Sequence, residues 1–170
     1  MNKANPYPYA MRGGLIIGIL YAMSFLFAAS GISVLSALTY LISVIAIVLA
    51  YRFTRAYREK DCNGIISFGQ VFWFILLLFF FAGVVSAVVK LFYLRFINPD
   101  FLETTFNQAM TVLEQMKVEI HEESIDLLHQ LMQPTEYVMQ SLMGDVLTGC
   151  FWGLVFAPFI RRNPQDQQNN

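Results

Sequence analysis

Four long apolar runs alternate along the chain with short segments rich in charged or turn-forming residues. A bilayer core about 30 Å thick is crossed by roughly 20 apolar residues in a helix, and each run comes close to that length. The third run is the most apolar, because residues 71–89 hold no charge and only Ser86 as a polar side chain. The pattern predicts four transmembrane helices, over residues 13–30, 33–51, 68–89 and 141–160.

The composition agrees with a membrane protein and excludes an ordinary soluble domain. Only 14% of the 170 residues are charged and the mean hydropathy is +0.52, whereas about 25% of the residues in soluble proteins are charged. A soluble fold of this size could not cover so much apolar surface. The net charge of -1 offers no basic excess for nucleic acid. We therefore expect an all-α integral membrane protein of one domain, with the lipid bilayer as its immediate partner.

The basic residues predict how the chain enters the bilayer. Lys and Arg are enriched on the cytoplasmic flanks of membrane helices. With four spans, eight basic residues fall on one side: Lys3, Arg12, Arg52, Arg55, Arg58, Lys60, Arg161 and Arg162. The other side holds residues 98–136, which contain eight acidic residues. Both termini are therefore expected in the cytoplasm, and the acidic segment outside.

A cleavable signal peptide is the alternative to the first span. The basic start, the apolar core from Gly14 to Ala29 and the small residues up to Ser30 fit that pattern as well. Cleavage would leave three spans, and the Arg-rich loop after residue 51 would then lie on the wrong side of the membrane. Four spans remain the favoured interpretation.

The arginines after the second span repeat every third residue, at Arg52, Arg55 and Arg58. Voltage sensors carry such a repeat within the bilayer, whereas these arginines begin where the apolar run ends. We expect them to bind the anionic headgroups of the inner leaflet.

The segment between the third and fourth spans predicts a separate amphipathic helix. Pro99 ends the third span, and Asp100 followed by Glu103 is a capping-box pattern for a new helix. Apolar residues then follow alternating spacings of four and three, which is a heptad seam. The seam consists of Leu102, Phe106, Ala109, Leu113, Met116 and Ile120.

This seam is interrupted once, and its partner is left open by the sequence. Glu123 breaks it before Leu127 and Leu131 resume an apolar stripe, and Pro134 ends the helix. We expect one long extramembrane helix that packs on a second copy of the chain, on the chain's own helix ends or on the membrane interface. Its acidic polar side disfavours anionic lipid. We favour protein, with a homo-oligomer preferred.

Two charged residues lie within the predicted third and fourth helices. At 1.5 Å per residue, Lys90 is about 28 Å from Val71, and Asp145 is about 23 Å from Ile160. The two helices run in opposite directions, so both charges reach a similar depth near the outer boundary. We predict an ion pair between Lys90 and Asp145; in the alternative, Lys90 reaches the outer headgroups and Asp145 is hydrated alone.

Small residues recur at every fourth position in two spans, a pattern that allows helix backbones to approach closely. We call these sets the small-residue ridges: Ala10, Gly14, Gly18 and Ala22 in the first span, and Gly149, Gly153 and Ala157 in the fourth. The favoured interpretation is that the first helix packs on the fourth within the bundle. The alternative is oligomerisation.

No pattern predicts an enzyme. Ser, Cys and His residues form no nucleophile constellation, and no glycine-rich loop is placed to hold phosphate. Cys62 and Cys150 lie at different depths, so two unpaired, unreactive thiols are expected. We expect no catalytic residue, no bound metal and no cofactor.

Three short stretches resemble a known family. They are the basic exit from Tyr51 to Arg58, the sequence GIISFGQVF from Gly64 to Phe72, and the sequence FINPDF from Phe96 to Phe101. With the closing Arg161-Arg162 pair, they are similar to the bacterial membrane family catalogued as domain of unknown function 4199. The resemblance implies a bacterial inner-membrane protein, with residues 98–136 in the periplasm, and it supplies no assigned activity or site.

Two functions follow as expectations. The first is a structural, accessory or protein-interaction role without catalysis, in which the acidic helix and the small-residue ridges contact other proteins. The alternative is a small transporter or channel component that uses Asp145 and Lys90.

Overall fold

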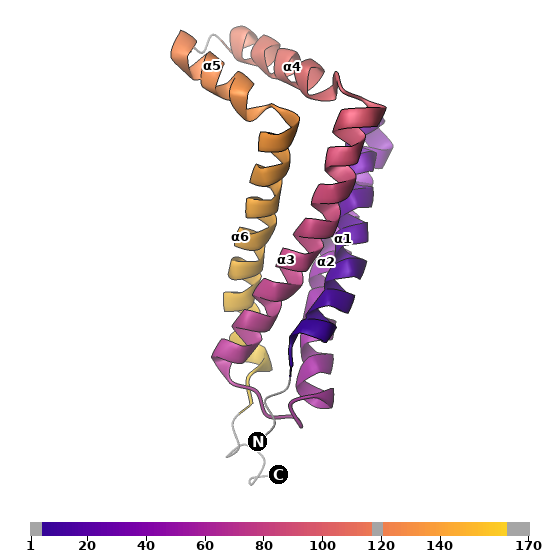
Figure 1. Cartoon of the computed structure of the whole chain (residues 1–170), viewed down its shortest axis with the longest axis vertical. Coiled ribbons are helices and arrows are strands. Elements are labelled where there is room, and N and C mark those ends of the chain that lie inside the picture. Colours follow the sequence, from indigo (N-terminus) through magenta and orange to yellow (C-terminus); the bar gives the residue numbers. More distant parts are fainter. Residues whose placement is uncertain (1–4, 117–120, 163–170) are drawn as a thin grey trace.

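The computed structural model describes residues 5–116 and 121–162, apart from the side chains of residues 122 and 123. The described elements, in chain order, are α1 (Tyr7–Ala29), α2 (Ser33–Lys60), α3 (Phe68–Phe92), the π-helix η1 (Tyr93–Ile97), α4 (Phe101–Gln115), α5 (Glu122–Leu131) and α6 (Pro134–Ile160). The all-helical class is thereby confirmed. The long helices α1, α2, α3 and α6 lie side by side, with the start of α1 and the end of α6 at one end of the bundle, which we call the end with the termini, and α4 and α5 at the other (Figure 1).

Four helices of the described chain are long and apolar enough to cross a bilayer. They are α1, α2, α3 continued by η1, and α6, and they coincide with the four predicted spans. All four are longer than predicted: α1 already begins at Tyr7, α2 runs on to Lys60, α3 with η1 runs on to Ile97, and α6 already begins at Pro134. The extensions of α2 and α6 are polar, so hydropathy alone does not mark them as helix.

The ends of the long helices follow local sequence signals. Gly31 adopts a φ of +71°, a left-handed conformation that suits glycine and allows the tight turn from α1 to α2. A capping box starts α3: the Ser67 backbone N–H donates to Gln70 Oε1 at 2.9 Å, and the Gln70 N–H donates to Ser67 Oγ at 3.4 Å. The capping box predicted at Asp100 is wrong, because that residue precedes α4 without a side-chain cap.

The third long helix, α3, is the centre of the bundle. Its apolar residues Phe74, Ile75, Leu78 and Phe79 have no exposed surface. Both α1 and α6 pack against α3, whereas many large side chains of α2 point outward. The strong hydropathy of the third span therefore reflects burial within protein as well as contact with lipid.

The small-residue ridges pack on α3 and not on each other. A Cβ added at Gly18 of α1 would lie 2.7 Å from the Ala82 carbonyl oxygen of α3, and one added at Gly149 of α6 would lie 2.7 Å from Phe79 Cβ. All seven ridge residues are buried. The predicted packing of the first helix on the fourth is therefore wrong: both ridges are used, but α3 lies between them as their common partner.

The end of the bundle that carries the termini is tied together by polar contacts. Arg58 of α2 donates a hydrogen bond from Nη1 to the Ile160 carbonyl oxygen at the C-terminal end of α6, at 3.1 Å. Ile66 and Arg162 form an antiparallel bridge with two backbone hydrogen bonds of 3.0 and 3.2 Å. The Arg58 side chain is only 12% exposed. Arg58, which was expected to bind lipid headgroups, therefore caps the C-terminal end of α6 within the bundle.

At the opposite end, α4 and α5 form a small projection that we call the head (Figure 1). The single long helix predicted here is wrong, because α4 ends at Gln115 and α5 starts at Glu122. Met116 lies in a turn after α4, and the apolar stripe is interrupted at Glu123 in the first turn of α5, so the seam of α4 does not continue along α5. The two helices meet where the rings of Phe106 and His129 are 5.3 Å apart.

Candidate functional site

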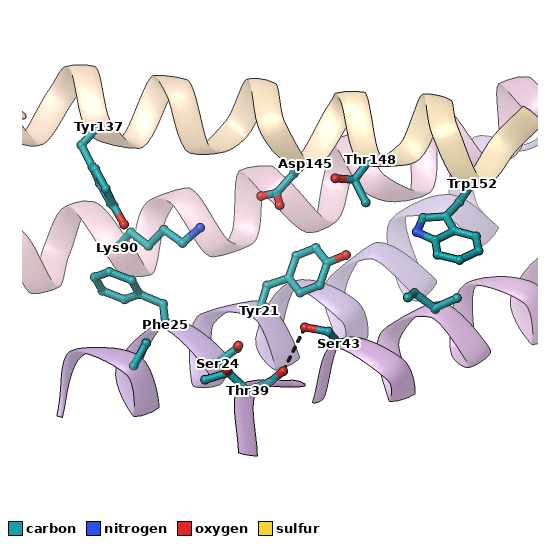
Figure 2. Close-up of a pocket in the computed structure, with 12 residues that line it drawn as sticks. Tyr21, Ser24, Phe25, Thr39, Ser43, Lys90, Tyr137, Asp145, Thr148 and Trp152 are labelled. Atoms are coloured by element: carbon teal, nitrogen blue, oxygen red, sulfur yellow. Dashed lines mark hydrogen bonds between the residues drawn. The ribbon is translucent and has the colours of Figure 1, made fainter. Parts of the chain in front are cut away.

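A polar cavity lies among all four long helices. Its volume is about 420 Å³, within the roughly 300–1,000 Å³ of ligand pockets. Its lining consists of Tyr21, Ser24, Phe25 and Ala28 of α1, Thr39, Ser43 and Ile47 of α2, Lys90 of α3, and Tyr137, Asp145, Thr148 and Trp152 of α6. Eight of these twelve residues carry an oxygen or an amine other than an indole. Figure 2 shows polar side chains of α1, α2, α3 and α6 converging on this space.

One face of α6 supplies the largest share of the lining. Tyr137, Asp145, Thr148 and Trp152 follow one another at helical spacings, so their side chains project to the same side of α6. Ser141, one turn before Asp145, shares that side. A polar stripe on a membrane helix is costly when it faces lipid, and here it faces the other three helices.

Lys90 is held at the head end of the cavity. Its side chain is buried to 9% exposure, and Nζ donates a hydrogen bond to Ser141 Oγ of α6. The amine also lies 6.0 Å from the centre of the Phe25 ring, within range of a weak cation–π contact. An ammonium group has three donor hydrogens, so the contact with Ser141 leaves further donors for the cavity.

Asp145 reaches the same cavity from α6. Its backbone approaches α3 so closely that a Cβ added at Gly83 would lie 3.1 Å from Asp145 Cβ. Oδ2 of Asp145 is buried and has no hydrogen-bond partner in the described structure. An unpaired buried carboxylate oxygen costs free energy unless something else solvates or binds it.

The structure brings Lys90 and Asp145 together without a direct bond. The ion pairs among the described residues are those of Glu59 with Arg55 and Arg58, and none joins Lys90 to Asp145 within 4.0 Å. In Figure 2 the amine and the carboxylate both point into the space between the helices. The predicted ion pair is therefore not formed as a direct contact. Lys90 and Asp145 line the same cavity, and Lys90 is hydrogen-bonded to Ser141.

The hydroxyl groups of the lining are held by their own helices. Ser43 donates to the Thr39 carbonyl oxygen at 2.9 Å, and Thr148 donates to the Gly144 carbonyl oxygen at 2.8 Å. These bonds use the hydroxyl hydrogens and leave oxygen lone pairs as acceptors. The lining therefore offers acceptors at the hydroxyls and Asp145, and donors at Lys90.

An aromatic group closes the cavity toward the termini. Trp152 lies 5.1 Å from Phe156 between ring centres, and Phe156 meets Tyr51 of α2 edge to face at 5.4 Å. These rings link α6 to α2 directly below the polar lining. The cavity therefore lies in the half of the bundle that carries the head, and the hydrogen bonds that Ser43 and Thr148 make on its wall are exposed.

The predicted interaction seam is partly buried by the chain itself. Leu102 is 3% exposed and packs with Phe25, Leu94 and Val138 at the ends of the long helices. Further along, Ala109 and Met116 are exposed. Phe106 and Leu113 are half-buried, and Ile120 lies outside the described residues. One of the three predicted partners, the chain's own helix ends, therefore covers the first turn of the seam only.

Both cysteines are free, and neither is placed for chemistry. Burial raises the pKa of the Cys62 thiol in the loop between α2 and α3. A thiol that stays protonated is a poor nucleophile and a poor metal ligand. This agrees with the expectation of unreactive thiols.

The sequence pointed to Lys90 and Asp145 but not to the residues around them. Tyr21, Ser24, Thr39, Ser43 and Thr148 are ordinary polar residues of membrane helices when each is taken alone. The signal that could have found them is their spacing, such as Ser141, Asp145 and Thr148 on one helical face. That spacing shows which side of a helix is polar, and only the fold shows that several polar sides meet.

Comparison with known families places the chain in one of them. A family model described as "Protein of unknown function (DUF4199)" matches residues 12–162. The chain belongs to the DUF4199 family. The match extends from Arg12 in α1 to the bridge at Arg162, and so includes the whole cavity lining, the head and both small-residue ridges apart from Ala10. Searches of curated proteins and of solved structures gave no significant match for this DUF4199 chain.

Proposed function

We propose that this DUF4199 protein binds a small polar molecule within the membrane, as a transporter or channel component, and catalyses no reaction. The observation that carries this proposal is the polar cavity, with Lys90 and Asp145 on its wall. Polar groups within membrane helices are costly and mark pathways for ions or solutes. A purely structural bundle would gain stability from apolar side chains at these positions.

The orientation is part of the proposal. We place the protein in a bacterial inner membrane with both termini in the cytoplasm and the head in the periplasm, since Lys and Arg favour the cytoplasmic side. The Arg58–Ile160 contact supports this placement because it brings the basic residues of α2 and the arginines just after α6 to one end of the bundle. The cavity would then lie in the periplasmic half of the membrane.

Labelling of single cysteines tests the orientation. In a chain with Cys62 and Cys150 replaced by Ser, the variants Gln108→Cys in the head and Asp61→Cys after α2 are both exposed. A membrane-impermeant maleimide added to intact spheroplasts should label Gln108→Cys and leave Asp61→Cys unlabelled until the cells are lysed. The reverse pattern would invert the topology.

Osmotic swelling of proteoliposomes tests the function. With the purified protein in liposomes, we expect faster swelling for at least one solute in a panel of amino acids, polyols and organic phosphates. Asp145→Asn should abolish the difference from empty liposomes while its gel-filtration profile stays unchanged. Swelling equal to that of empty liposomes for every solute would count against transport.

A second candidate is an accessory role through protein contacts. It is favoured by the exposed apolar side chains of the head, which include Val112, Met116 and Leu127. Another membrane protein or a second copy of the chain would cover them. Affinity purification in mild detergent tests this role. A bound partner should be lost from the Met116→Glu variant and retained by the Asp145→Asn variant. If both variants retain the partner, the head is not the surface that binds it.

A further inference from the structure

The chemistry of the cavity wall restricts what the cavity can hold. One cation and one anion face the same space, so their charges sum to zero. A solute with charge of one sign only would leave one of them without an opposite charge in a site of low polarity, which is unfavourable. A solute that carries both a cationic and an anionic group satisfies the two sides together.

The positions of the two charges give the solute an orientation. Lys90 contacts Ser141, and Asp145 follows one turn later toward the aromatic floor at Trp152. The anionic part of a bound solute would therefore lie toward the head and its cationic part deeper. One turn of helix is about 5.4 Å, so the two charged groups must be joined by a short chain.

Hydrogen bonding restricts the cationic group further. Asp145 Oδ2 is buried and has no donor in the described structure, and nearby hydroxyls of Ser43 and Thr148 donate to their own helices. Asp145 Oδ2 is thus a buried acceptor without a donor of its own in the described structure. A primary ammonium supplies three donors, whereas a quaternary ammonium supplies none.

We propose that the cavity binds a short zwitterion in which a primary ammonium is linked to an anionic group, with the ammonium at Asp145 and the anion at Lys90. Ethanolamine phosphate has this chemistry, either as a free solute or as the headgroup of a phospholipid. The inference rests on the proposed function, since it names what the same cavity takes up.

The chain supplies its own reporter for this site. It has two tryptophans: Trp152 lines the cavity, and Trp73 of α3 is 50% exposed on the outside of the bundle. Trp73→Phe therefore leaves a single indole whose emission responds to occupation of the cavity. Titrations of this variant in detergent free of phospholipid use O-phosphoethanolamine, phosphocholine, ethanolamine and inorganic phosphate as probes.

O-phosphoethanolamine should change the Trp152 emission saturably. Phosphocholine, ethanolamine and phosphate should each bind at least about tenfold more weakly, since a charge-assisted hydrogen bond is worth that factor or more. Asp145→Asn should remove the preference over phosphocholine, and Lys90→Met the preference over ethanolamine. Asp126→Asn and Arg95→Met alter exposed charges away from the cavity and should leave the titration unchanged.

The source of the zwitterion is decided in nanodiscs. Emission that differs between phosphatidylethanolamine and phosphatidylcholine discs, without displacement by the free compound, supports the proposal with a lipid headgroup as the ligand. Displacement by free O-phosphoethanolamine supports it with a soluble ligand. A response to ethanolamine or phosphate as strong as to the zwitterion overturns the inference and leaves the proposed function intact. No response to the free compound or to the discs overturns it too, and the swelling assay still decides the proposed function independently.

Discussion

The two ends of the membrane bundle are built differently. At the end with the termini, α2 and α6 touch through the rings of Tyr51 and Phe156 and through the hydrogen bond from Arg58 to Ile160. Toward the head, the same two helices line the cavity, with Ser43 on one and Asp145 on the other. The contacts that fix α2 against α6 and the polar side chains therefore occupy separate halves. The difference indicates which half of the bundle is structural and which is free to carry function.

Close packing on α3 should give the largest effect on stability. Gly18→Ala places a Cβ 2.6 Å from Val85 Cβ and 2.7 Å from the Ala82 carbonyl oxygen, so α1 must move away from α3. We expect the free energy of unfolding to fall by about 3 kcal/mol, at the upper range for overpacking. Detergent-denaturation curves followed by helicity measure it.

Gly144→Ala is the matched control for that substitution. Nothing lies within 4 Å of a Cβ built at Gly144, and alanine favours helix over glycine by up to about 1 kcal/mol. This variant should be as stable as the parent chain or more stable. Equal losses in both variants would show that α1 and α3 are not as closely packed as described.

The contact between α2 and α6 should give an intermediate effect. Arg58→Ala removes the cap on the C-terminal end of α6, and we expect a loss of about 1.5 kcal/mol for a charged hydrogen bond to a mostly buried carbonyl. Arg55→Ala, whose side chain is 59% exposed and pairs only with Glu59, should cost less than about 0.5 kcal/mol. The same denaturation curves compare the two. Indistinguishable losses would reduce Arg58 to an ordinary surface arginine.

The cavity should give the smallest effect on stability. Thr148→Val keeps the shape of the side chain, and the lost hydroxyl bonds only to its own helix. We expect a change in stability within about 0.5 kcal/mol, together with a blue shift of Trp152 emission in the Trp73→Phe chain, because the cavity becomes less polar. A loss as large as that of Arg58→Ala would mean that the cavity wall is itself structural, and the contrast between the two halves would fail.

The four spans could be predicted because their signal is local. Length and hydropathy are properties of each run by itself, and α3 and α6 end close to where proline and charge indicate. Which helix packs against which could not be predicted in this way. The ridges of Gly18 and Gly149 indicate that some helix approaches closely, but a ridge does not say which one. On α3 the same spacing of small residues is confined to one short stretch, residues 82–87.

The cavity and the head could not be predicted for a related reason. Asp145 is recognisable as the one charged residue of its span. Ser43 of α2 and Tyr21 of α1 become part of a site only because the fold places their helices opposite Asp145 of α6. In the head, the heptad seam through Leu113 and Met116 indicated one helix because the spacing continues up to Ile120. The chain instead forms α4 and α5, and the contact between Phe106 and His129 depends on how the two helices are placed, which the spacing along the chain does not show.

The bridge between Ile66 and Arg162 has a mechanical consequence. It joins the loop before α3 to the residues just after α6, and the head joins the other ends of the same two helices. Helix α6 is therefore attached at both extremities, firmly at one and through two short helices at the other. The bridge therefore fixes the spacing of α3 and α6 at the arginine-rich end, and Gly149 and Gly153 continue the close contact with α3 toward the cavity. The wall of the cavity that α6 supplies is thus held in place by a helix that is supported on both sides of it.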